Sequence, residues 1–432
     1  MTRLSRRRLM QGLGAMTASP LLSSFPLPAY AQGAARIVVI GGGAGGATLA
    51  KYVKTGAPNA NVTLVERSPR YTSCFYSNLY IGGFRTIESL THSYDRLKST
   101  GVNFVQDVAV DIDSNARVVT MMSGTRISYD KLVLSPGIDI DLGAIEGYSE
   151  EATQIMPHAW RGGDQTKLLK AQLEAMKDGG VVIVAPPANP FRCPPGPYER
   201  ICMIAHYLKH NKPRSKIVLL DAKKEFSKQT VFMEAFENHY KGMIEVNLTN
   251  EIDNFAVVQV DAQKKLVKVK SGQEFKGDVV NVIPPQKAGG IAWRAGCVEG
   301  RWCPVSPENF ASTKVKDVFV IGDASNAAHM PKSAFSANSQ AKYVANLLVA
   351  ELNGQKPLPS RLRNTCWSLL AENDSVKVGA SYQVGEISGA PGLVAAGPFV
   401  SEPGEANDVR ARNYKESQGW YSAITTDMFA TS

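Results

Sequence analysis

Several features that would assign a sequence quickly are missing from this one. Its 432 residues contain no Cys-x-x-Cys pair and no Cys-x-x-Cys-His motif, so the chain carries no c-type haem of its own. It has no internal repeat and no cluster of Lys and Arg interleaved with aromatics, which argues against nucleic acid as a partner. No apolar run is clean enough over the about 20 residues that cross a bilayer, so no integral membrane segment is expected in the mature chain.

The first 31 residues read as an export signal. Ser5–Met10 is a twin-arginine pattern, Leu9–Leu27 is a mildly apolar stretch, and Ala29–Ala31 fits a small-x-small cleavage site. A basic amphipathic arm or membrane anchor is the alternative, but glycine and proline interrupt the apolar stretch. Removing the four arginines of this segment lowers the formal net charge from +9 to +5. The sequence therefore predicts a periplasmic protein, exported by the twin-arginine pathway, whose mature chain begins near Gln32.

A glycine-rich turn follows the first strongly apolar stretch of the mature chain. Gly41, Gly43 and Gly46 have the G-x-G-x-x-G spacing that lets backbone amides approach a dinucleotide pyrophosphate at a helix N-terminus. Glu66, 20 residues beyond Gly46, ends the next strand, where its carboxylate would accept the ribose hydroxyls. The predicted strand, helix and strand of this βαβ unit occupy residues 37–40, 47–55 and 61–65. The pattern predicts a dinucleotide-binding domain.

A second element, far along the chain, favours FAD over NAD at this turn. An apolar strand at residues 317–321 runs into Gly322 and Asp323, a pair that places a carboxylate on the flavin ribitol in proteins with two dinucleotide-binding domains. A helix expected to start near Lys332 would point its positive end at the flavin pyrimidine.

The second nucleotide half-site has lost its glycines. A strand (181–184), a helix (198–209) and a strand ending at Asp221 repeat the βαβ frame, but the turn at residues 185–197 is rich in proline. Prolines remove amide donors and block close approach of the backbone, so NAD(P)H is not an expected substrate. The turn instead displays Cys193 and, one helical turn later, Glu199.

Six cysteines in an exported protein favour disulfides over metal. Cys193, fixed by prolines, and Cys366, near the C-terminus, are the natural members of a redox-active pair, although spacing alone leaves the pairing open. Cys297 and Cys303 could close a short structural loop. A zinc site on the helix face that carries Cys202, His206 and His210 lacks a carboxylate, so no metal is predicted.

The expected fold class is α/β, with two Rossmann-like dinucleotide-binding-type domains and a C-terminal α+β interface domain. The FAD-binding domain is assigned to residues 32–150 and 288–356, the NAD-like domain without a nucleotide site to 151–287, and the C-terminal domain to 357–432. The last of these shows no amphipathic helix long enough to lie on a membrane.

Several motifs together resemble one family. The stretches are Tyr-Thr-Ser-Cys-Phe-Tyr-Ser-Asn at 71–78, Phe-Arg-Cys-Pro-Pro-Gly-Pro-Tyr-Glu-Arg at 191–200, Ile-Gly-Asp-Ala at 321–324, Met-Pro-Lys-Ser at 330–333 and Asn-Thr-Cys at 364–366. With the twin-arginine leader, they resemble the flavoprotein subunit of flavocytochrome c sulfide dehydrogenase, which shares its broader fold with glutathione-reductase-like flavoproteins.

The resemblance implies a function and assigns roles to residues. Cys74 would be linked covalently to the flavin 8α carbon, and Cys193 and Cys366 would form the redox-active disulfide. Glu199 is the implied proton acceptor, and Trp420 the aromatic side chain over the active site. Sulfide would be oxidised to sulfur or polysulfide, with electrons passing singly from FAD to a c-type cytochrome subunit that carries the haem in a heterodimer. Cys202, Cys297 and Cys303 have no place in this chemistry.

Two other functions stay open at this point. A sulfide:quinone oxidoreductase would use the same disulfide and flavin but would be expected to have an apolar quinone channel and a C-terminal amphipathic anchor. A redox-silent FAD-binding scaffold of an exported cytochrome complex would need neither Cys193 nor Cys366 for its role.

Overall fold

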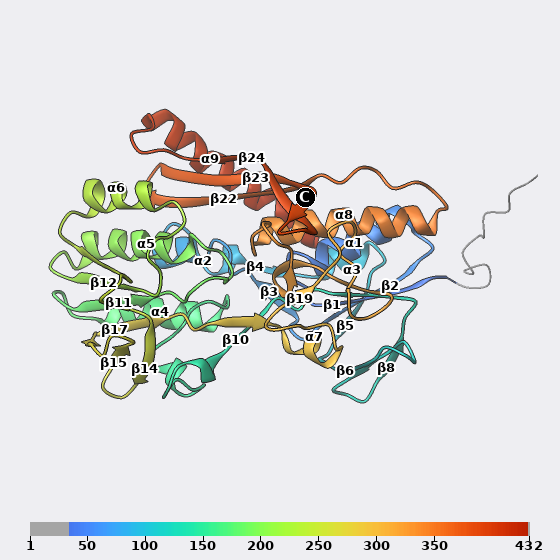
Figure 1. Cartoon of the computed structure of the whole chain (residues 1–432), viewed down its shortest axis with the longest axis horizontal. Coiled ribbons are helices and arrows are strands. Elements are labelled where there is room, and N and C mark those ends of the chain that lie inside the picture. Colours follow the sequence, from blue (N-terminus) through green and yellow to red (C-terminus); the bar gives the residue numbers. More distant parts are fainter. Residues whose placement is uncertain (1–33, 431–432) are drawn as a thin grey trace, which may run out of the picture. The chain divides into compact units, whose positions relative to one another are not determined.

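A computed structural model describes residues 34–430 (Figure 1). The predicted export signal at residues 1–31 lies outside the described residues. The chain forms two α/β units, each built on a sheet of parallel strands, and a C-terminal antiparallel sheet, in agreement with the predicted fold class.

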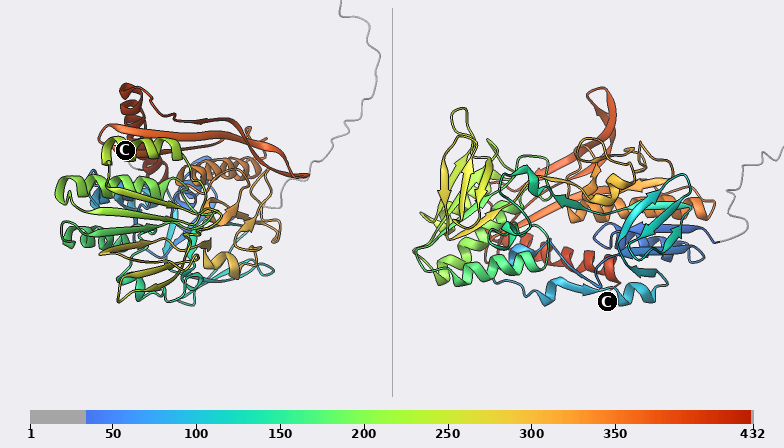
Figure 2. Two further views of the ribbon diagram at one scale, coloured as in Figure 1. Left: turned by 60° about the vertical axis from the view of Figure 1, so that its left-hand side comes forward. Right: turned by 90° about the horizontal axis from the view of Figure 1, so that it is seen from below.

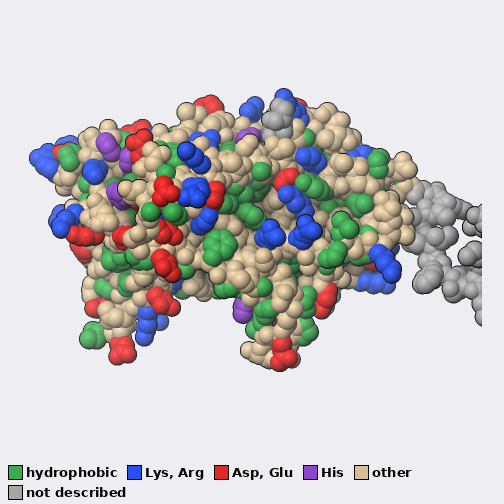
Figure 3. Space-filling view, turned by 90° about the horizontal axis from the view of Figure 1, so that it is seen from above, with side chains coloured by type: hydrophobic (Ala, Val, Ile, Leu, Met, Phe, Trp, Pro, Cys, Tyr) green, Lys and Arg blue, Asp and Glu red, His purple; other side chains and the backbone are tan. Residues whose placement is uncertain are grey.

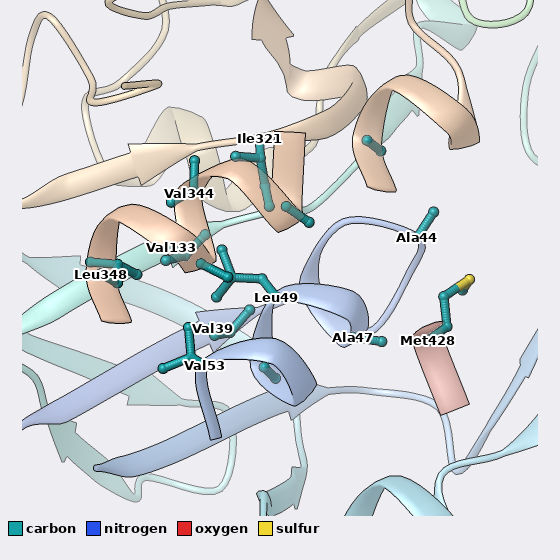
Figure 4. Close-up of a cluster of buried hydrophobic side chains, with 14 of the residues drawn as sticks. Val39, Ala44, Ala47, Leu49, Val53, Val133, Ile321, Val344, Leu348 and Met428 are labelled. Atoms are coloured by element: carbon teal, nitrogen blue, oxygen red, sulfur yellow. The ribbon is translucent and has the colours of Figure 1, made fainter. Parts of the chain in front are cut away.

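The first domain is built on a five-stranded parallel sheet in the order β20-β9-β1-β2-β5. Its strands are β1 (Arg36–Ile40), β2 (Asn61–Glu66), β5 (Asn103–Gln106), β9 (Lys131–Leu134) and β20 (Val318–Val320), and the main helices are α1 (Gly46–Gly56) and α8 (Ala334–Leu352). The predicted strand-turn-helix-strand is confirmed, with α1 starting one residue earlier than expected. Leu49 and Val53 of α1 pack with Val344 and Leu348 of α8 over this sheet (Figure 4).

Smaller elements complete this domain. They are β3 (Arg70–Thr72), α2 (Ser77–Ile81), β4 (Thr91–Ser93), α3 (Asp95–Ser99), β6 (Ala109–Asp113), β7 (Val118–Met121), β8 (Arg126–Ser128), α7 (Gly290–Arg294), β19 (Cys303–Pro304) and β21 (Ser325–Asn326).

The second domain repeats the parallel βαβ frame with the strand order β13-β12-β11-β17. Its elements are α4 (Asp164–Ala175), β11 (Val181–Ala185), α5 (Gly196–Asn211), β12 (Lys216–Asp221), α6 (Gln229–Tyr240), β13 (Ile244–Leu248) and β17 (Val279–Val282), with an antiparallel sheet of β14 (Val257–Asp261), β15 (Leu266–Val269) and β16 (Glu274–Lys276). Helix α5 begins at Gly196, after the proline-rich turn that follows β11 and two residues earlier than the sequence predicts.

The chain crosses between these two domains at a pair of short strands. β10 (Ile138–Ile140) runs antiparallel to β18 (Gln286–Ala288). Ile145 and Tyr148, which follow β10, pack in the core of the second domain, and the Tyr148 hydroxyl donates to Val282 O at 3.4 Å. The second domain therefore begins before residue 151.

The C-terminal region is a three-stranded antiparallel sheet followed by one long helix. The strands are β22 (Leu362–Ala371), β23 (Asp374–Ile387) and β24 (Ala390–Val400), and β23 and β24 form an extended hairpin (Figure 2). The region also contains a long helix that the sequence analysis did not identify, α9, which spans 23 residues, Asn407–Phe429. Its last turns bury Ile424, Met428 and Phe429 in the core of the first domain.

No helix in the part of the chain that the structure describes is long and apolar enough to cross a membrane. On the face drawn in Figure 3, basic and acidic side chains both occur across the surface.

Candidate functional site

One cavity of about 890 Å³ lies where the first glycine turn, the Cys193 loop and the C-terminal region meet. Ten of the twelve predicted site residues line it: Gly41, Gly43, Glu66, Cys74, Cys193, Glu199, Gly322, Asp323, Cys366 and Trp420. Segments more than 300 residues apart in the sequence are thus brought to a single site. Gly46 and Lys332 lie outside the lining.

Gly46 packs against the backbone of the turn and does not line the cavity. A Cβ atom at this position would lie 1.9 Å from Gly41 O, so only glycine lets α1 begin this close to the turn. Gly41 has a φ of +101°, and a Cβ there would lie 2.3 Å from Ser135 O. Gly43 faces the cavity, where the Tyr71 ring is the first neighbour at 3.7 Å. The glycines therefore have different tasks: two fix the turn, and the third keeps its cavity face open.

Glu66 is held at the end of β2 by two backbone amides. Its Oε2 accepts from Gly42 N at 2.8 Å, and its Oε1 accepts from Ser68 N at 2.9 Å. Each carboxylate oxygen can accept a second hydrogen bond. The predicted contact with two ribose hydroxyls is compatible with this geometry.

Asp323 provides the clearest test of whether the cavity fits a flavin. Its Oδ1 is buried and has no hydrogen-bond partner within residues 34–430, while its Oδ2 lies 3.8 Å from the Arg192 guanidinium. Burial raises the pKa of the carboxyl group, and Arg192 and Lys332 act against that rise. A buried acceptor without a donor is costly, and a ribitol hydroxyl would satisfy it. The residues present therefore fit FAD.

Lys332 does not face this cavity, contrary to its predicted role. Its Nζ donates to Ser325 O at 2.6 Å and to Asp323 O at 3.0 Å, and lies 3.7 Å from the centre of the Trp302 ring. It lines a second cavity, of about 610 Å³. The helix beyond it begins at Ala334, where Ser333 Oγ accepts from Ser336 N at 3.0 Å as N-cap. The positive end of α8 does reach the flavin cavity, through Ser333 and Ala334.

Cys74 lies in a loop that aromatic side chains support. Its carbonyl accepts from Ser77 Oγ at 2.6 Å, and the residue lines the cavity. Phe75 packs against Trp420 with ring centres 5.7 Å apart, and Trp420 is parallel to Phe335 at 6.0 Å. Trp420 thus lines the cavity within a group of aromatic side chains, and its role over the active site stays a prediction.

Cys193 is presented by a strained, tightly packed loop. Its φ is 57°, its N–H donates to Lys332 O at 2.8 Å, and its carbonyl accepts from Gly196 N at 2.8 Å. A Cβ on Gly196 would lie 3.0 Å from the Cys193 sulfur and 2.9 Å from the Trp160 ring. Close packing therefore leaves Cys193 little freedom to move.

Cys366 approaches the same cavity from β22. Asn364 Nδ2 lies 3.4 Å from its sulfur, and Ser333 Oγ donates to Asn364 Oδ1 at 2.6 Å. All six cysteines are free thiols here, so the predicted disulfide is not formed in this structure, and the pairing stays a prediction. Burial raises the pKa of both Cys193 and Cys366.

Glu199 lies on the first turn of α5 with both oxygens hydrogen-bonded. Oε2 accepts from Asn78 Nδ2 at 2.8 Å, and Oε1 accepts from Leu369 N at 2.9 Å. Burial raises the pKa of Glu199, while these donors favour its carboxylate form. A carboxylate whose pKa is raised in this way is a better proton acceptor than an exposed one.

Sequence reasoning gave no role to two polar residues that organise the site, Arg200 and Lys228. Arg200 is 1% exposed and donates from Nε to Asn78 Oδ1 at 3.1 Å, which turns the Asn78 amide nitrogen toward Glu199. Lys228 reaches the same region from the residue before α6. Arg200 belongs to the 191–200 motif, so its position gave a signal. Lys228 gave none, because only the packing of α6 on β22 brings it to the site.

In the nucleotide half-site of the second domain, the acidic residue at the end of β12 is bonded to the protein's own side chains. Asp221 Oδ2 accepts from the Tyr198 hydroxyl at 2.6 Å, and its Oδ1 pairs with Lys223 at 2.6 Å. The Tyr198 ring stacks on Phe226 with centres 3.7 Å apart. The acidic residue that would accept the adenosine ribose hydroxyls of a nicotinamide dinucleotide is therefore already engaged.

The remaining cysteines lie away from the cavity lining. Cys202, Cys297 and Cys303 are buried in hydrophobic clusters. Among residues 34–430, no group of three or more His, Cys, Asp or Glu side chains is arranged to hold a metal ion.

Three sequence models of known families match the chain. Residues 166–284 match "Sulfide dehydrogenase (flavocytochrome c) flavoprotein chain, central", and residues 359–429 match "Flavocytochrome c sulphide dehydrogenase, flavin-binding". Residues 35–183 match "Pyridine nucleotide-disulphide oxidoreductase".

Individual relatives agree with these matches. A sulfide dehydrogenase (flavocytochrome c) flavoprotein chain from Chlorobaculum thiosulfatiphilum is 48% identical over 46 residues, which is 96% of that sequence and 11% of this chain. The mitochondrial sulfide:quinone oxidoreductase of Mus musculus is 24% identical over 360 residues, 80% of this chain and 78% of that protein. The solved structure of the sulfide:quinone oxidoreductase of Aquifex aeolicus has a TM-score of 0.70 at 19% identity and covers 92% of this chain and 93% of its own. The chain therefore belongs to the family of flavocytochrome c sulfide dehydrogenase flavoprotein chains, with the fold of the pyridine nucleotide-disulphide oxidoreductases.

Proposed function

We propose that this chain is the FAD-containing subunit of an enzyme that oxidises sulfide to sulfur or polysulfide and passes the electrons to a c-type cytochrome. One observation carries the proposal: a single cavity joins a flavin-compatible glycine turn and Asp323 to the thiols of Cys193 and Cys366. The matched family and the sulfide:quinone oxidoreductase relatives both support sulfide oxidation by a flavoprotein.

The chain's own residues supply the sulfur chemistry. With Cys193 and Cys366 joined as a disulfide, hydrosulfide attacks one sulfur, and the bond between the two cysteines breaks. A new S–S bond forms to the incoming sulfur, and the other cysteine leaves as a thiolate. Glu199 takes the proton from the resulting persulfide. A further hydrosulfide that takes up the zero-valent sulfur as polysulfide breaks the new S–S bond and leaves a second cysteine thiolate. The two thiolates re-form the disulfide by giving up two electrons, for which FAD, when bound, would be the acceptor and the source of single electrons for the next carrier.

The electron acceptor separates two candidates. A c-type cytochrome, bound as a heterodimer and carrying the haem, is favoured by the flavocytochrome family to which the chain belongs. A quinone is the second candidate, because a sulfide:quinone oxidoreductase aligns with 80% of this chain. The apolar side chains at the end of α9 are buried within the protein, where they cannot anchor it to a membrane.

Two finer features belong to the same proposal. The position of Cys74 in the cavity lining supports a covalent bond to the flavin. The twin-arginine pattern at Ser5–Met10 supports export to the periplasm, a route that carries folded proteins with their cofactors in place.

Anaerobic titration of the purified protein tests the redox proposal. Sulfide, but not NADH, should bleach the flavin band near 450 nm, and acid precipitation should leave yellow colour in the pellet if Cys74 holds the flavin. Bleaching by NADH and not by sulfide would make the protein a pyridine-nucleotide enzyme. A colourless pellet would refute the covalent link alone.

Two further measurements separate the alternatives. Sulfide-dependent reduction of a soluble c-type cytochrome, with none of a short-chain ubiquinone analogue, supports the cytochrome acceptor, and the reverse supports the quinone. Cys193→Ser and Cys366→Ser should keep bound flavin but lose its reduction by sulfide. A redox-silent scaffold would have no sulfide-dependent reduction to lose.

A further inference from the structure

Lys228 is a buried cation beside the thiol pair. It precedes α6, only 6% of its surface is exposed, and its φ of 60° is uncommon for a residue other than glycine. Its Nζ donates to Ser368 Oγ at 2.8 Å and to Cys366 O at 3.2 Å. The second domain thus places a charged side chain directly against the segment of β22 that carries Cys366.

The titratable groups around this ammonium are acidic, and the thiols among them are uncharged in the resting protein. Both hydrogen-bond acceptors of Nζ are neutral oxygens. The titratable groups that face it are the thiols of Cys366, Cys193 and Cys202 and the carboxyl group of Glu199. Burial lowers the pKa of Lys228 to about 8, and these acidic groups oppose that fall.

The Cys366 thiol is likewise surrounded by groups that bear on its charge. Burial raises its pKa, and the Asn364 amide, the Lys228 ammonium and the Ser333 hydroxyl act against the rise, whereas Glu199 adds to it. Its other titratable neighbours are Cys193 and Tyr382. Lys228 is therefore the cation that acts on Cys366 most directly.

A buried ammonium whose hydrogen-bond acceptors are neutral becomes more stable when a further negative charge forms beside it. In the proposed reaction such a charge forms whenever the disulfide opens, because one sulfur then holds an electron pair as a thiolate or a deprotonated persulfide. We propose that Lys228 is a positioning residue that stabilises this negative charge on the Cys366 sulfur. Its role in turnover rests on the proposed function, whereas its effect on Cys366 can be measured without it.

The test uses the full-length, flavin-loaded protein with Cys193→Ser, in which no disulfide between the pair can form. Cys366 is alkylated with iodoacetamide between about pH 6 and 10, and its modification is followed by peptide mass spectrometry. Lys228→Gln keeps a donor for Ser368 Oγ but removes the charge. The alkylation midpoint should rise by about one to two pH units, which slows alkylation at least about tenfold near neutral pH.

Matched variants separate charge from packing. Lys228→Arg keeps the positive charge and should hold the midpoint near that of the parent. Lys223→Gln removes another largely buried lysine of the same domain, one paired with Asp221, and should leave the midpoint unchanged. An unchanged midpoint in Lys228→Gln, or an equal rise in Lys223→Gln, would overturn the inference.

Ser368→Ala provides the test if Lys228→Gln does not fold, because it removes one acceptor of Nζ and should raise the midpoint by a smaller amount. No rise there would also overturn the inference. Neither sulfide nor an electron acceptor is used. A shifted midpoint in a protein that fails to oxidise sulfide would therefore refute only the proposed function.

Discussion

The two turns that follow β1 and β11 show how one backbone frame supports two kinds of chemistry. Each turn joins a buried parallel strand to a helix, and each helix leads to a strand with an acidic last residue. The first turn is made of glycines and offers backbone amides. The second is made of prolines and offers side chains, Cys193 and Glu199. The βαβ frame sets the position of each site, and the residues of the turn set which chemical groups the site offers.

The acidic residues at the strand ends have diverged in the same way. Glu66 lines the cavity, and each of its oxygens keeps a lone pair beyond its bond to a backbone amide. Asp221 is 0% exposed and is bonded to Tyr198 and Lys223. The acidic residue predicted to bind a ribose in the first copy of the motif corresponds, in the second copy, to one that is bonded within the protein. The second domain thus uses for its own stability a position that the first domain is predicted to use for ligand binding.

Gly46→Ala should have the largest effect, because it breaks the first turn. The added Cβ would lie 1.9 Å from Gly41 O, and backbone cannot move as a flexible side chain can. We expect a destabilisation of about 2–4 kcal/mol and loss of most of the bound flavin, read from urea unfolding and the flavin absorbance of the purified protein.

Gly419→Ala is the matched control for that change. Gly419 lies within α9, and a Cβ there meets no atom within 4 Å. It should keep its flavin and gain slightly in stability, since alanine favours a helix by about 1 kcal/mol over glycine. Equal flavin content in both variants would mean that the glycine turn does not hold the cofactor.

Glu199→Gln tests the second turn. Burial raises the pKa of Glu199, so the carboxylate is lost as pH falls through that raised value, and sulfide-dependent flavin reduction should fall with it. The Gln variant should react at least about 100-fold more slowly, because a general base is typically worth 10²–10⁴-fold. Its rate should also lack this fall at low pH, the acidic limb of the pH profile. Stopped-flow flavin reduction against pH measures both effects. A retained acidic limb in the variant would assign it to another group.

Most of the fold and of the flavin site could be predicted because local patterns encode them. Gly41, Gly43 and Glu66 lie within one βαβ unit, and the apolar strands set their places. The predicted contact of Lys332 with the flavin was wrong for a local reason. A strand-helix pattern locates the start of a helix only to within a residue or two, and neighbouring side chains at that start can face different cavities. Lys228 and the core-packed α9 depend on contacts between domains, which no local pattern records.

Tyr198→Phe should have the smallest effect and tests whether Asp221, the acidic residue at the end of β12, has a structural role. The change removes the hydroxyl that donates to the buried Asp221, although Lys223 still pairs with that carboxylate, so we expect a loss of about 1–3 kcal/mol in urea unfolding. Tyr207→Phe on the same helix is the control, because its partly buried hydroxyl lies in the less enclosed half of α5 and its removal should change stability by no more than about 0.5 kcal/mol. If the two variants are equally stable, the Tyr198 hydroxyl does not contribute to stability through Asp221. If Tyr198→Phe alone is destabilised while flavin content stays the same, the acidic strand end serves stability in the second domain and ligand binding in the first.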